Sequence, residues 1–92
     1  MSPSAEPWVP QWAVHPGEVI REALEERSMP QSEFAKRMDV SAKHVNLVLQ
    51  GKSGYSADFA IGMEYVLGIS AAFWLNLQAE YRLALLRRKE TP

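Results

Sequence analysis

Polar side chains recur at helical spacing in the stretch VSAKHVNLVLQGK, residues 40–52. At about 100° per residue, Val45 and Val48 fall on one face of a helix. The opposite face holds five residues: Ala42, Lys43, Asn46, Leu47 and Gln50. The Lys43 ammonium group can donate to guanine edges in DNA, and the Asn46 amide can pair with adenine. Small apolar residues on the same face can contact a thymine methyl group.

Residues around this stretch carry groups suited to a sugar-phosphate backbone. Ser41 is a good N-cap for the helix. Gln31 stands at the start of a preceding helix, where backbone and side-chain donors can meet a phosphate. Lys52 follows the helix, and His44 lies at the edge of its polar face. An ordinary solvated surface would explain the same pattern, because such patterns also arise in small helical domains that bind no DNA.

Five helical segments are predicted to position these residues, and no segment alternates as a strand would. Pro16 is tolerated in the first turn of the first helix, which should stop near Ser28 because Pro30 disfavours a helical residue before it. A second helix starts near Gln31. The third helix begins after the N-cap Ser41 and ends at Gly51, and the fourth begins after Ser56 and ends at Gly68. Ser70 is the N-cap of the fifth helix.

The second and third helices are short, and a tight turn at Asp39 and Val40 joins them. Two short helices with such a turn are typical of the helix-turn-helix motif. The predicted fold is therefore all-α, a five-helix helix-turn-helix bundle with an extended N-terminal arm. We expect an arm over residues 1–16, a DNA-binding domain over 17–88 and a tail over 89–92.

The arm contains four prolines, which rule out a regular helix, and two tryptophans, Trp8 and Trp12. Exposed tryptophans are large apolar areas that favour a docked position. We expect the arm to pack on the acidic first helix around Glu22 and Glu26, forming a surface for a basic partner. A disordered tail is the alternative.

Composition limits the classes of function. The chain has 92 residues, 47% of them hydrophobic, which fits one small globular domain. It has no cysteine, and its net charge of −1 gives no overall attraction to nucleic acid. No apolar run could span a bilayer, and the first residues lack the features of a signal peptide, so a cytoplasmic bacterial protein is expected.

An enzyme is not expected. Gly51-Lys52-Ser53 looks like the end of a phosphate-binding loop, but it lacks the upstream glycine and follows a helix instead of a strand. His15 and His44 are isolated in the sequence. His15 is expected to cap or pack at the first helix, and His44 to lie on the surface near a phosphate. No metal site or cofactor is predicted.

The sequence resembles the XRE (lambda-repressor-like) helix-turn-helix proteins, and among them the HigA-type antitoxins of bacterial type II toxin–antitoxin systems. The resemblance covers roughly residues 15–86 and is carried by three stretches: HPGEVIREALEERSMPQSEFAKRMDVS, KHVNLVLQGK and FWLNLQAEYRLAL. Gln31 matches the Gln that opens the second helix of the family. The start and middle of the family's recognition helix are matched by Ser41, Ala42, Lys43, Asn46 and Leu47. Asp39 stands where the family usually has Gly, and the arm has no counterpart.

This resemblance implies a homodimer that binds operator DNA, represses its own operon and neutralises a RelE-like, mRNA-cleaving toxin. The candidate dimer face is the apolar stripe of the fifth helix: Phe73, Trp74, Leu77 and Tyr81. Other possibilities remain open at this point. They are a stand-alone or phage-type repressor, the DNA-binding domain of a longer regulator, and a protein-interaction module that has lost DNA binding.

Overall fold

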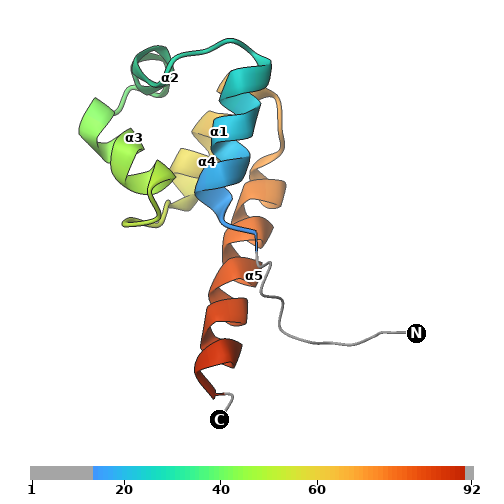
Figure 1. Cartoon of the computed structure of the whole chain (residues 1–92). Coiled ribbons are helices and arrows are strands. Elements are labelled where there is room, and N and C mark those ends of the chain that lie inside the picture. The colour runs from blue at the N-terminus through green and yellow to red at the C-terminus, as the bar shows by residue number, and fades with distance from the viewer. Residues whose placement is uncertain (1–13, 91–92) are drawn as a thin grey trace.

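The computed structural model describes residues 14–90, and within that range the backbone forms five α-helices and no strand. The helices are α1 (Pro16–Glu26), α2 (Gln31–Met38), α3 (Ala42–Leu49), α4 (Ala57–Leu67) and α5 (Ala71–Glu90). The all-α prediction is therefore confirmed. Helices α1 to α4 form a compact head, and α5 packs on the head with its first half and projects beyond it with its second (Figure 1).

The expected boundaries differ slightly from the observed ones. The helical body runs from Pro16 to Glu90, so the domain limits expected at residues 17 and 88 fall just inside it. The tail expected from residue 89 begins as helix. Residues 1–13, with Trp8 and Trp12, lie outside the described range, and so does the expected packing of the arm on the first helix.

Side chains at the helix starts explain why the helices begin where they do. His15 Nδ1 accepts a hydrogen bond from the Gly17 amide at 2.9 Å and caps α1, as expected. Three serines cap α3, α4 and α5 through their Oγ atoms: Ser41, Ser56 and Ser70. Helix α2 differs, because Pro30 occupies its N-cap position and supplies no side-chain acceptor.

The turn between α2 and α3 has the geometry of the predicted helix-turn-helix. Helix α2 ends at Met38 and α3 begins at Ala42. Asp39 takes the left-handed conformation, with φ of 58°, at the position where the family usually has Gly. Asp adopts this conformation more readily than most residues, because its short polar side chain can hydrogen-bond locally. The sequence can therefore make the turn without glycine.

The core draws one fully buried large side chain from each helix. These five are Ile20 in α1, Phe34 in α2, Val45 in α3, Met63 in α4 and Trp74 in α5. The indole Nε1 of Trp74 donates to the Ile69 carbonyl at 3.1 Å. The prediction that Trp74 belongs to a dimer face is therefore wrong, because its side chain has no exposed surface and packs inside its own chain.

A reciprocal pair of hydrogen bonds fastens the loop after α3 to α5. The buried Gln78 side chain accepts from the Tyr55 amide at 2.9 Å and donates to the Tyr55 carbonyl at 2.8 Å. The Tyr55 hydroxyl then donates to the Trp74 carbonyl at 2.6 Å. We refer to these three bonds as the Gln78–Tyr55 clamp. It sets the position of α5 relative to the helix-turn-helix.

The clamp leads to a prediction about alkaline pH. Burial raises the pKa of the Tyr55 hydroxyl to about 12, and the nearby Arg82 charge opposes part of this rise. Because the pKa is higher in the folded state than the ordinary value of 10.0, Tyr55 contributes its full stability below pH 10. That contribution is lost as the pH rises from 10 toward 12, by up to about 2 kcal/mol.

The variant Tyr55→Phe should lower the free energy of unfolding by about 1 kcal/mol at neutral pH, through loss of one hydrogen bond. Because the parent loses up to about 2 kcal/mol in this window, the difference in unfolding free energy should shrink to zero and then reverse as the pH rises toward 12. Urea unfolding at a series of pH values measures it. Tyr65→Phe is the control, because Tyr65 is 82% exposed. A difference that stays constant up to pH 12 would contradict the prediction.

Candidate DNA interface

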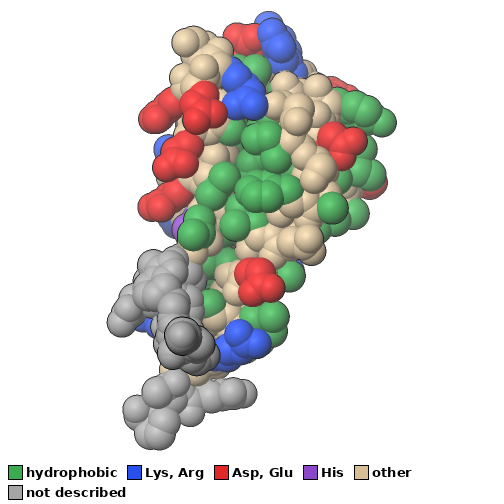
Figure 2. Space-filling model, turned by 90° about the vertical axis from the view of Figure 1, so that its right-hand side faces the viewer, with side chains coloured by type: hydrophobic (Ala, Val, Ile, Leu, Met, Phe, Trp, Pro, Cys, Tyr) green, Lys and Arg blue, Asp and Glu red, His purple; other side chains and the backbone are tan. Residues whose placement is uncertain are grey.

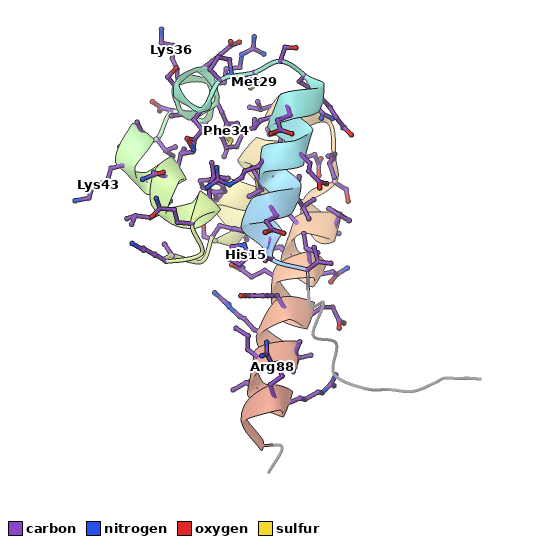
Figure 3. The ribbon with its side chains drawn as sticks, viewed as in Figure 1. His15, Met29, Phe34, Lys36, Lys43 and Arg88 are labelled. Carbon is purple, nitrogen blue, oxygen red and sulfur yellow. The ribbon has the colours of Figure 1, made fainter. Side chains whose placement is uncertain are left out.

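The two faces of α3 divide as the sequence predicts. Val45, Val48 and Leu49 are buried against the head. The outward residues Ala42, Lys43, Asn46 and Gln50 are exposed, and Leu47 is half-buried. Lys43 points away from the head into open space (Figure 3). The outer face of α3 therefore offers one cation and two amides, with little apolar surface between them.

Asn46 and Gln50 lie one helical turn apart on this face. Gln50 Nε2 donates to Asn46 Oδ1 at 3.4 Å, a long hydrogen bond between two exposed side chains that orients the Asn46 amide weakly. A carbonyl oxygen of this kind accepts two hydrogen bonds, so Asn46 keeps one acceptor site and its two amide donors for a partner. This is the capacity that pairing with an adenine edge requires.

Two further predicted residues lie in the segments before and after α3. Gln31 is the first residue of α2 and is exposed, at a helix start that has no side-chain cap. The unfilled amide groups and the helix dipole favour an anion there. Lys52 is exposed in the loop after α3, where its amide donates to the Leu47 carbonyl at 2.9 Å. Both residues therefore remain candidates for contacts with phosphates.

His44 is less available than the sequence suggests. Its ring is half-buried and meets the Phe59 ring edge-on, with the ring centroids 5.4 Å apart. Its amide donates to Ser41 Oγ at 3.0 Å. The side chain thus helps to pack α3 on α4. No local sequence signal separates this packing role from the predicted contact near a phosphate.

The described residues contain neither a cluster of metal-binding side chains nor a helix that could span a membrane. No three His, Asp or Glu side chains among them come together in a way that could hold a metal ion. None of the helices in the described range combines the length and apolar character needed to cross a bilayer.

Two short helices, a tight turn and a polar outer face on the second helix define a DNA-binding domain of the helix-turn-helix class. No family model matches the sequence. The HTH-type transcriptional regulator YddM of Escherichia coli K12, described as uncharacterized, is 36% identical over 69 residues, which are 75% of this chain and 73% of YddM. The chain belongs to the XRE-like helix-turn-helix family of regulators and HigA-type antitoxins, which are DNA-binding proteins and not enzymes.

Solved structures support the same assignment. PA4674 of Pseudomonas aeruginosa, in complex with its 18-base-pair operator DNA, superposes with a TM-score of 0.79 at 39% identity and 85% coverage of both chains. Pseudomonas aeruginosa antitoxin HigA, with the higBA promoter, gives a TM-score of 0.78 at 40% identity, covering 84% of this chain and 85% of that one. The resemblance seen in the sequence is therefore confirmed at the level of the family.

The geometry of α3 leads to a prediction about base recognition. Replacing Asn46 with Ala should weaken binding to the operator by about 1–3 kcal/mol and relax the preference at one base pair. Lys52→Ala should instead weaken binding to all DNA sequences about equally. It should also lower the slope of log affinity against log salt concentration by about one. Fluorescence anisotropy with single-base operator variants measures both effects. An Asn46→Ala protein with the parent's affinity and preference would show that the assigned face is wrong.

Proposed function

We propose that the protein is an antitoxin that binds its operator as a homodimer, represses its own operon and neutralises a RelE-like, RNA-cleaving toxin. The observation that carries the proposal is the exposed Lys43, Asn46 and Gln50 face on the recognition helix. The named HigA relative was solved with its promoter, which supports operator binding. A protein that acts on bacterial operator DNA works in the cytoplasm.

A dimer is proposed because one recognition helix buries too little surface for tight specific binding. Helix α5 carries large apolar side chains that its own chain leaves partly open. Phe73 is 43% exposed, Leu83 42% and Leu86 57%. Tyr81 is half-buried and meets the His15 ring at a centroid distance of 5.0 Å. The proposed dimer face therefore keeps the exposed Phe73 and the half-buried Leu77 and Tyr81 of the predicted stripe, without Trp74.

Charging this face should separate the protomers. Phe73→Glu is expected to give a folded monomer in light scattering, because an unpaired carboxylate cannot be buried at an apolar interface. Operator affinity should fall about 100-fold, since the two half-sites are no longer bound as a unit. Ala72→Glu is the matched control, an exposed neighbour with the same added charge. A parent protein that binds each half-site as a monomer would contradict the proposal.

The surface proposed for the toxin is the acidic side of α1. Its exposed carboxylates are Glu18, Glu22, Glu25 and Glu26. Figure 2 shows a row of acidic side chains along one edge of this view, beside a wide apolar area. Arg27 is turned toward backbone, donating to the Ala23 and Leu67 carbonyls at 2.7 Å. An RNA-cleaving toxin must attract a polyanion, so a basic surface on it would complement this row.

The arm is proposed to extend the same surface. Deleting residues 1–14 leaves the His15 cap of α1 in place, so the head should fold and bind operator as before. Toxin affinity should fall, as measured by calorimetry with the purified toxin. The double variant Glu22→Lys, Glu26→Lys should also lower the affinity for the toxin, because it reverses two charges on this surface. If the truncated protein bound toxin as tightly as the parent, the arm would have no part in neutralisation.

A regulator without a toxin is the second candidate, favoured by the description of YddM as a transcriptional regulator. It predicts operator binding of the same kind and no neighbouring toxin gene. Co-purification from the native host, with bound DNA and protein both identified, separates the two candidates.

A further inference from the structure

A pocket of about 190 Å³ lies where the loop after α3, the start of α1 and the middle of α5 meet. Ser53 and Gly54 line it from the loop, His15 from the start of α1, and Tyr81 and Arg82 from α5. None of its lining residues is Asp or Glu, and Arg82 carries its one permanent charge. The pocket is therefore suited to a negatively charged group.

The guanidinium group of Arg82 lies against the loop at Gly54. A side chain at Gly54 would collide with Arg82 Nη2 and would lie 2.9 Å from Gln78 Oε1, so only glycine leaves room for this approach. Gln78 is one helical turn before Arg82 and is itself fixed by the Gln78–Tyr55 clamp. The hydrogen bonds of Gln78 thus fix the part of α5 from which the exposed Arg82 side chain extends toward the loop.

Arg82 has no carboxylate partner among residues 14–88. The ion pairs in that range join Arg27 to Glu26 and Arg37 to Glu33. Arginine residues at a protein surface bind carboxylates or phosphates through two parallel N–H groups. The guanidinium group of Arg82 can therefore bind a carboxylate or phosphate that does not belong to residues 14–88.

The pocket borders the loop that carries Lys52. Its loop residues Gly51, Ser53 and Gly54 flank Lys52, the proposed backbone contact. In Figure 1 this loop lies below α3 and to the left of α5. Lys43 points outward on the same side of the molecule in Figure 3. A DNA strand presents a phosphate about every 3.4 Å along the helix axis. A strand that contacts Lys52 would therefore place further phosphates along the loop that borders the pocket.

We propose that Arg82 binds a backbone phosphate of the operator, next to the phosphate bound by Lys52. Helix α5 would then contact DNA directly, in addition to carrying the proposed dimer face. The inference rests on the proposed operator binding and adds to it a contact that lies outside the helix-turn-helix.

The test compares Arg82→Gln with Arg88→Gln, which removes the same charge from the same helix but outside the pocket. Operator affinity is measured by anisotropy over a salt series. Arg82→Gln should lose on the order of tenfold in affinity at low salt and lower the salt slope by about one, with base preference unchanged. Arg88→Gln should keep the parent slope. Arg82→Lys should also keep it, because the positive charge remains.

Operators carrying a single neutral methylphosphonate locate the contact. One position beside the Lys52 contact should weaken the parent and leave Arg82→Gln unaffected. Equal salt slopes for Arg82→Gln and Arg88→Gln, or a loss that depends on bases and not on phosphates, would overturn the contact while operator binding stands. A parent that binds no operator DNA would overturn the proposed function as well. Thermal unfolding of each variant distinguishes a lost contact from a lost fold.

Discussion

The Gln78–Tyr55 clamp is the interaction on which the functional geometry depends. One buried side-chain amide satisfies both backbone groups of Tyr55, and the Tyr55 hydroxyl satisfies a carbonyl of α5. Removing one partner from such a network leaves buried polar groups unpaired, at about 1–3 kcal/mol each. Because the loop held this way follows α3 directly, the clamp joins the recognition helix to α5 as one rigid unit.

This rigidity matters for a dimer on DNA. Half-sites on a duplex are spaced by about one helical turn, 34–36 Å, so the two recognition helices must be held at that separation. If protomers pair through α5, the angle between α5 and α3 sets the separation. His15 also connects the start of α1 to the end of α3. It caps α1, and its ring leaves no room for a side chain at Gly51, just past the end of α3.

Local signals predicted the helices well, and contacts between helices were predicted poorly. The serine caps, the left-handed Asp39 and the outward face of α3 follow from neighbours in the sequence, so they could be predicted. Trp74 could not be placed from spacing, because α5 carries apolar residues on several faces and periodicity does not choose among them. Gln78 resembles an ordinary solvated position, and its role depends on Tyr55, far away in the sequence.

The capping of α2 has a consequence for the free protein. The other four described helices have a side chain that accepts a hydrogen bond from the first turn, whereas Pro30 offers no side-chain acceptor to the amides at the start of α2. An uncapped helix of this length is held mainly by its packing, through Phe34 and Ala35. A phosphate at its start would act as the missing cap. DNA would then complete the local structure that it binds, and the amide hydrogens of α2 would exchange more slowly in the complex than in the free protein.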